Sequence, residues 1–323
     1  MQYSQCTAND GCALAFQTSL LLPIDGTQPP ATWDKGASCI LLMHGFSGSS
    51  AYFERNFAAL STAGYWVVAP DMRGHGRSHR GSGGYHVARL AADLRDLIAH
   101  LREASGRKDL TLLKFIPVGC SIGAAVLWTY VELFGCGDFA GLACVDQAPL
   151  QDRSPFGNGG WDESQAHRGC YDEKTMIAAQ ETLVRNPEVA HAGLVADCLG
   201  YRFAPEPNDA DAVSAEQREH DERFFTQISS LCDSEWLARL LADHTRYDHR
   251  EAIEGINVPT LVMAGRRTGC FPLEGMHETV RRVGKNRPGL ATWSVFDSGH
   301  WLFYEEPERF NREIIDFVQR CTK

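Results

Sequence analysis

The chain has 323 residues, of which 44% are hydrophobic and 22% are charged. This composition is that of an ordinary globular protein and excludes a disordered chain or a coiled coil. Its 31 basic and 41 acidic residues give a net charge of −10, so we expect neither nucleic acid nor an anionic membrane surface as a partner. No run of about 18 uncharged apolar residues is present, and no membrane-spanning helix is expected.

The N-terminal sequence and the cysteines indicate the cellular location. The first residues are not basic and no apolar segment follows them, so we expect no secretory signal. The 11 cysteines are scattered without a C-x-x-C pair, and their odd number leaves at least one unpaired within the chain. A reducing, cytoplasmic location is expected. Because no histidine or cysteine spacing is typical of a metal site, we expect no metal and no cofactor; a homodimer is left open.

Short apolar runs alternate with longer helical patterns along the chain. An edge strand is expected within residues 12–22. Further strands are expected at Cys39–Met43, Trp66–Ala69, Leu110–Val118, Leu142–Val145, Thr260–Ala264 and Thr292–Phe296. Helical patterns lie between these runs, for example after Ser49, from Val87, from Ile122 and from Pro307. This alternation predicts an α/β fold with a mainly parallel sheet and helices on both faces.

One long segment interrupts the alternation. Between Pro149 and Pro259 the sequence contains helical patterns but no convincing strand. Long excursions of this kind in compact domains are usually functional. We therefore predict a helical cap inserted at 150–245, over a core formed by 1–149 and 246–323.

The strongest motif is Gly119-Cys-Ser-Ile-Gly123, which lies between a predicted strand and a predicted helix. A G-x-S-x-G sequence in this context is typical of a sharp turn that exposes the serine hydroxyl above the end of the strand. The N-terminus of the following helix then directs backbone N–H groups towards developing negative charge. The simpler alternative is that Ser121 caps the helix.

Three further motifs follow the expected order of one family. They are His44-Gly-Phe-Ser-Gly48, Asp71-Met-Arg-Gly-His-Gly-Arg-Ser78 and a C-terminal segment that begins Ser298-Gly-His-Trp301. Together with the serine motif, they resemble the α/β-hydrolase family over nearly the whole chain. The resemblance implies Ser121 as nucleophile and His300 as general base. It also implies an oxyanion hole formed by the backbone N–H groups of Phe46 and Ile122.

The acidic residue of the expected triad departs from the common pattern. Most members carry an aspartate in a G-x-x-D-x-x-x-P sequence, whereas this chain has Thr268 at that position. The family also uses a second position, at the end of the strand after the nucleophile helix, and Asp146 stands there. We therefore predict Asp146 as the acid. Asp297 and Glu274 are the other candidates, and Asp146 could instead cap the turn before Pro149.

A serine nucleophile favours attack on a carbonyl group and excludes the aspartate-dependent dehalogenase and epoxide hydrolase chemistries of the family. The Gly-Cys-Ser-x-Gly sequence and the early acid are similar to those of fungal zearalenone-type lactonases. We expect a small-molecule ester or lactone as substrate, in an apolar pocket that includes Trp161, Tyr171 and Trp301. A C–C bond hydrolase, a cofactor-free dioxygenase and a non-catalytic ligand-binding protein are the alternatives.

Overall fold

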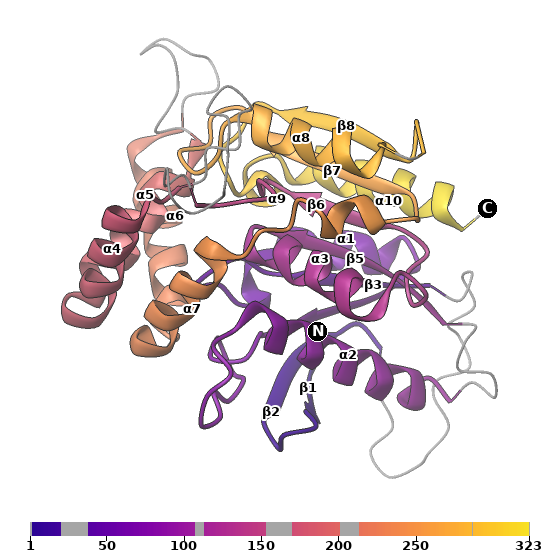
Figure 1. Ribbon diagram of the computed structural model, residues 1–323, viewed down its shortest axis with the longest axis horizontal. Coiled ribbons are helices and arrows are strands. Elements are labelled where there is room, and N and C mark those ends of the chain that lie inside the picture. The colour runs from indigo at the N-terminus through magenta and orange to yellow at the C-terminus, as the bar shows by residue number, and fades with distance from the viewer. Residues whose placement is uncertain are drawn as a thin grey trace.

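A computed structural model describes residues 2–20, 38–106, 113–152, 170–200, 213–285 and 287–322. Trp161 and residues 110–112 of one predicted strand lie outside these ranges. The centre of the fold is an eight-stranded sheet with the order β1-β2-β4-β3-β5-β6-β7-β8 (Figure 1). Its strands are β1 (Gln2–Thr7), β2 (Ala13–Thr18), β3 (Ser38–Met43), β4 (Trp66–Pro70), β5 (Lys114–Cys120), β6 (Leu142–Val145), β7 (Thr260–Gly265) and β8 (Ala291–Phe296).

The sheet is mainly parallel, as the sequence predicts. Only the pairings of β2 with β1 and with β4 are antiparallel; the six strands from β4 to β8 run parallel. All residues of β3 and β4 are buried, as expected for strands covered on both faces. Parallel strands end at one edge of a sheet, so the residues that follow β5, β6 and β8 are brought together there.

Helices cover both faces of the sheet (Figure 1). On one face, α2 (Val87–Ala104) and α3 (Ile122–Phe134) form a core with the sheet residues that point towards them. On the other face, α1 (Phe57–Thr62), the short α9 (Leu302–Glu305) and α10 (Pro307–Cys321) do the same. Helix α8 (Leu273–Val283) packs against β7 and β8. The predicted α/β class is confirmed.

Among the described residues, four α-helices separate β6 from β7 in the chain and lie together at one end of the molecule (Figure 1). They are α4 (Glu173–Arg185), α5 (Pro187–Cys198), α6 (Ala215–Ser229) and α7 (Ser234–Arg246). The sequence patterns indicated α4, α6 and α7 but missed α5, whose small residues give it no clear apolar period. The sequence patterns also missed α8 and β1. Among the described helices, none is long and apolar enough to cross a membrane.

The turn after β4 is held by buried polar contacts. The carboxylate of Asp71 accepts hydrogen bonds from the backbone N–H groups of Ser50 and Arg77, at 2.6 and 2.9 Å. His44 Nε2 accepts from the N–H of Met72 at 2.9 Å, and burial lowers the pKa of His44 to about 4. This imidazole is therefore neutral, and its role is to join the turn to the loop after β3.

Arg73, in the same turn, is a buried cation. Its guanidinium donates two hydrogen bonds to Asp93 of α2, at 2.8 and 2.9 Å, and contacts Asp10 at 2.7 Å. The side chain of Arg73 is 1% exposed and that of Asp93 is 7% exposed. Burying an ion costs free energy that only close partners offset, so this network is sensitive to the loss of one partner.

Replacing Asp93 with asparagine should leave the Arg73 charge poorly compensated and lower the free energy of unfolding by about 3 kcal/mol. Urea denaturation of the variant and the wild type measures this difference. Glu219→Gln is the matched control, because the pair that Glu219 forms with Arg223 is exposed and is worth less than about 1 kcal/mol. Equal losses in the two variants would show that the buried network is not needed for stability.

Candidate active site

Ser121 lies on a strained turn between β5 and α3. Its φ is +54°, in the left-handed region that residues other than glycine rarely adopt. A Cβ atom at Gly119 would lie 2.6 Å from the backbone N of Ala124, and one at Gly123 would lie 2.7 Å from the carbonyl oxygen of Met43. A side chain at either position would clash with backbone atoms, so both positions require glycine. The Ser121 side chain does not cap α3, so its hydroxyl is left for the cavity described below.

His300 and Asp146 form a buried pair. The Nδ1 atom of His300 lies 2.6 Å from Oδ2 of Asp146, and Oδ1 of Asp146 accepts a hydrogen bond from the N–H of Gly265 at 3.0 Å. Asp146 is completely buried and His300 is 3% exposed. Both carboxylate oxygens are therefore engaged, and the bond at Nδ1 leaves Nε2 as the ring nitrogen of His300 available to another group.

The surroundings of the pair stabilise the charged form of His300. Burial lowers the pKa of His300, while the neighbouring Cys270 and the hydrogen bond to Asp146 raise it above its ordinary value. Burial raises the pKa of Asp146, and the bond to His300 partly reverses that effect. A site of this kind stabilises the imidazolium that forms when the histidine accepts a proton.

The two alternative acids lie elsewhere. Asp297 is 46% exposed and pairs with Arg267 at 2.6 Å, and Glu274 is exposed on α8. Neither contacts His300 among the described residues. The hydroxyl of Thr268, at the position of the usual family aspartate, accepts a hydrogen bond from the N–H of Cys270 at 3.1 Å.

The loop after β3 lies directly against Ser121. A Cβ atom at Gly45 would be 3.3 Å from the Cβ of Ser121, so glycine permits this approach. The next residue is Phe46, and Ile122 is the first residue of α3. Within the described chain, the backbone N–H groups of these two residues have no hydrogen-bond acceptor. Ile122 adjoins Ser121 in the chain, and Phe46 follows the glycine that lies against Ser121.

The His300 loop is fixed to the end of α5 by close backbone contacts. The N–H of His300 donates to the carbonyl of Cys198 at 2.7 Å. A Cβ atom at Gly200 would lie 2.2 Å from the N of Gly299, so only glycine fits there. The Glu305 carboxylate accepts the N–H of Gly200 at 2.9 Å and that of Gly299 at 3.1 Å. Glu305 thus joins the helical segment to the loop that carries His300.

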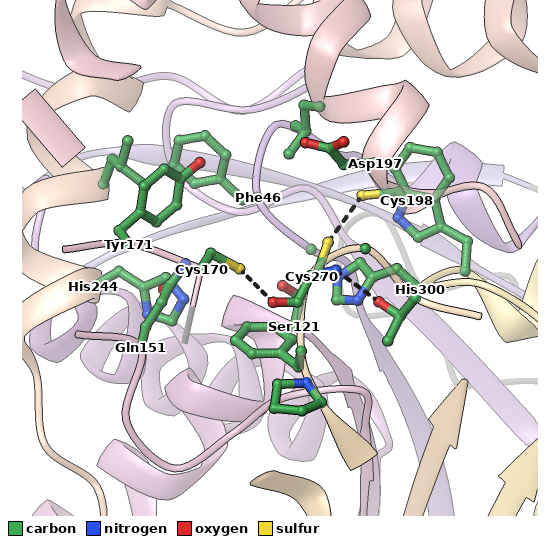
Figure 2. Close-up of a pocket in the computed structure, with 18 residues that line it drawn as sticks. Phe46, Ser121, Gln151, Cys170, Tyr171, Asp197, Cys198, His244, Cys270 and His300 are labelled. Atoms are coloured by element: carbon green, nitrogen blue, oxygen red, sulfur yellow. Dashed lines mark hydrogen bonds between the residues drawn. The ribbon is translucent and has the colours of Figure 1, made fainter. Parts of the chain in front are cut away.

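Ser121 and His300 face one cavity of about 480 Å³ (Figure 2). Two predicted pocket residues, Tyr171 and Trp301, also line it, whereas Trp161 is outside the described residues. Apolar and polar groups share the wall. The lining residues are Gly45, Phe46, Ser121, Gln151, Cys170, Tyr171, Leu194, Asp197, Cys198, Leu241, His244, Thr268, Gly269, Cys270, Phe271, Pro272, His300 and Trp301.

Sequence reasoning missed three cysteines in this wall. The Sγ atoms of Cys198 and Cys270 are 3.7 Å apart, and the thiol of Cys170 donates to the carbonyl oxygen of Cys270 at 3.0 Å (Figure 2). Hydrogen bonds with Cys170 and Cys198 lower the pKa of Cys270. The three thiols come from separate segments, and no local spacing pattern could have indicated their contact.

Comparison with known proteins identifies the family of this chain. The sequence profile of the alpha/beta hydrolase family matches residues 40–313. Epoxide hydrolase A of Mycobacterium tuberculosis (strain ATCC 25618 / H37Rv) is 35% identical over 319 residues, covering 88% of this chain and 91% of that protein. The chain therefore belongs to the α/β-hydrolase family, and it is a hydrolase enzyme.

Solved structures show the same fold. The esterase EaEST from Exiguobacterium antarcticum superposes with a TM-score of 0.75 at 18% identity, over 98% of this chain and 99% of that one. The enol-lactonase from Burkholderia xenovorans LB400 superposes with a TM-score of 0.72 at 18% identity, over 98% and 100% of the two chains. At this level of identity, the likeness concerns the fold alone.

We predict that Asp146→Asn folds but loses about 10⁴-fold in kcat, because the amide cannot stabilise the imidazolium and favours the wrong tautomer of His300. Hydrolysis of an activated ester, together with a circular dichroism spectrum, measures both properties. Asp297→Asn is the control, and it should retain the wild-type rate. Near-normal turnover by Asp146→Asn would remove Asp146 from the site.

Glu305 should make stability depend on pH. Burial raises the pKa of this carboxyl to about 7 from its ordinary 4.5, although the two backbone N–H groups oppose the rise. The folded protein then holds a proton that the unfolded chain has released. Its stabilising effect is present at pH 4.5 and is lost as pH rises through about 7.

Glu305→Gln should flatten this decrease in the free energy of unfolding, which urea denaturation at several pH values measures. The exposed Glu308→Gln serves as control and should keep the wild-type slope. Identical slopes for wild type and Glu305→Gln would contradict the assignment.

Proposed function

We propose that this protein is a serine hydrolase that cleaves a carboxylic ester or a lactone through an acyl-enzyme intermediate. The observation that carries the proposal is the position of Ser121. Its hydroxyl faces the same cavity as the ring of His300, whose other side is bonded to buried Asp146. A serine hydroxyl is a weak nucleophile at neutral pH and needs such a base.

In the proposed reaction, Oγ of Ser121 attacks the substrate carbonyl carbon while Nε2 of His300 accepts the hydroxyl proton. The tetrahedral oxyanion accepts hydrogen bonds from the N–H groups of Phe46 and Ile122. When the C–O bond breaks, His300 returns the proton to the leaving alkoxide. Water then attacks the acyl-enzyme by the same route and releases the acid and free Ser121.

Each group in this scheme has an energetic role. Removing one oxyanion-hole donor typically costs about 3 kcal/mol in the barrier. The backbone donors are held rigidly, because Phe46 lies in the loop that Gly45 brings against Ser121 and Ile122 begins α3. Asp146 stabilises the imidazolium in both steps.

The cavity suits a compact substrate with an apolar part. At about 480 Å³ it lies within the ordinary range for small-molecule sites. Phe46, Leu194, Leu241 and Phe271 offer apolar contacts, while Gln151 offers hydrogen bonds. The sequence similarity to zearalenone-type lactonases around Ser121 favours lactones among the possible esters.

Ser121 also distinguishes this proposal from the other reactions of relatives. Epoxide hydrolase A is similar in sequence, but the family's epoxide chemistry uses an aspartate nucleophile, and this chain has serine at that position. A cofactor-free dioxygenase would need the His300–Asp146 pair but not the serine hydroxyl.

The test is a p-nitrophenyl acetate burst assay combined with fluorophosphonate labelling. We expect a burst, a label that mass spectrometry maps to Ser121, and a loss of at least about 10⁴-fold in turnover for Ser121→Ala. Ser230→Ala, an exposed serine at the end of α6, is the control that should keep both signals.

Two results would overturn the proposal. Oxygen-dependent turnover that survives in Ser121→Ala would identify a dioxygenase. Stoichiometric ligand binding without burst, label or turnover across a panel of esters and lactones would identify a binding protein.

A further inference from the structure

The cavity wall brings two thiols and the candidate base into one cluster. Cys198 ends α5, Cys270 lies in the loop after β7, and His300 lies in the loop after β8. One ligand atom from each of the three lies within 4.8 Å of the other two. Figure 2 shows the sulfur atoms of Cys198 and Cys270 facing each other beside the His300 ring. All three residues line the cavity, although the Cys198 side chain is only 2% exposed.

The distance between the sulfur atoms matches a known coordination geometry. Two thiolates bound to a tetrahedral zinc ion at about 2.3 Å are separated by about 3.8 Å. The observed separation of Cys198 Sγ and Cys270 Sγ is 3.7 Å. An ion could therefore enter between these groups with little movement of either side chain. Thiolate and imidazole ligands select zinc and similar soft cations over magnesium or calcium.

The surroundings of His300 also resemble those of a metal ligand. Its Nδ1 atom is bonded to Asp146, which leaves the Nε2 lone pair as the donor. Histidines that bind metals usually donate their other N–H to a carboxylate or a carbonyl, and this bond fixes the ring and raises its basicity. The hydrogen bond between Asp146 and Nδ1 would therefore make Nε2 of His300 suitable both as a base and as a metal ligand.

We propose that Cys198, Cys270 and His300 form a site for one thiophilic divalent cation of the zinc type, and that binding of this cation blocks catalysis. Binding displaces every proton held by the two sulfur atoms and by Nε2 of His300; these protons are released to solvent. It leaves a fourth position that faces the cavity. The blocking effect rests on the proposed function, because it depends on His300 acting as the base. With its Nε2 lone pair bound to the cation, His300 cannot accept the proton of Ser121.

Sequence reasoning predicted no metal, because the three residues are too far apart along the chain to form a spacing pattern. The fold joins them through the bond between the N–H of His300 and the carbonyl of Cys198. The proposed site is therefore a property of the assembled cavity, and it uses none of the closed four-ligand motifs of structural zinc sites.

Binding is tested on the reduced full-length chain by titration with Cd²⁺, read from thiolate-to-cadmium ultraviolet absorption. We expect one tight equivalent for the wild type, and more than about 100-fold weaker binding for Cys198→Ser and for Cys270→Ser, since losing an outer partner alone costs 10- to 100-fold. Cys321→Ser, a thiol at the end of α10, is the matched control and should bind normally. Ser121→Ala should also bind normally.

Inhibition is tested separately with Zn²⁺. Turnover of an activated ester by the wild type should fall reversibly and return when EDTA is added. For Cys270→Ser, turnover with and without the same Zn²⁺ concentration should be equal, whatever its turnover without Zn²⁺. If the enzyme hydrolyses no ester, the Cd²⁺ titration of wild type and Ser121→Ala still decides whether the site exists.

Three results would overturn the proposal. They are the absence of a tight Cd²⁺ equivalent, unchanged Cd²⁺ affinity in both cysteine variants, and full turnover with one Zn²⁺ bound. If a cysteine variant does not fold, alkylation of the wild-type protein is measured instead of Cd²⁺ binding by the variant. Bound Zn²⁺ should then protect Cys198 and Cys270 from N-ethylmaleimide, as peptide mapping shows, and unprotected thiols would count against the site.

Discussion

The hydrogen bond between Asp146 and His300 is the interaction on which the site depends. It joins the ends of β6 and β8, two strands separated by β7 in the sheet, and Gly265 at the end of β7 completes it by donating its N–H to the same carboxylate. Three neighbouring strands therefore converge on one buried acid. Because Asp146 has no exposed surface, its bond to Nδ1 of His300 is shielded from solvent.

Backbone conformations that glycine permits bring the other groups to this pair. Gly119 and Gly123 allow the turn that carries Ser121, and Gly45 allows the loop after β3 to reach it. Gly200 and Gly299 allow the end of α5 to pack against the His300 loop, where Glu305 bonds both of their N–H groups. Helix α5 belongs to the helical segment between β6 and β7. This segment is therefore attached directly to the loop that carries His300.

The sequence was sufficient to predict the fold. Ser121, His300 and Asp146 could be singled out because each stands next to a motif or at the end of an apolar strand, and their catalytic roles stay a prediction. Asp146 was identifiable even though Thr268 occupies the usual position. The sequence did not reveal α5, whose alanines, glycine and histidine lack a helical apolar period, or the contact between Cys198 and Cys270. That contact depends on how separate segments dock, which no local pattern records.

The order of the strands along the chain has a consequence for biosynthesis. Ser121 and Asp146 follow β5 and β6, but His300 follows β8, the last strand and the far edge of the sheet. On a translating ribosome Ser121 and Asp146 are made long before His300, and the sheet edge that receives β8 stays open until the end. Under the proposed mechanism, a nascent chain is therefore unable to hydrolyse its substrate, and the appearance of activity would report that the C-terminal segment has docked.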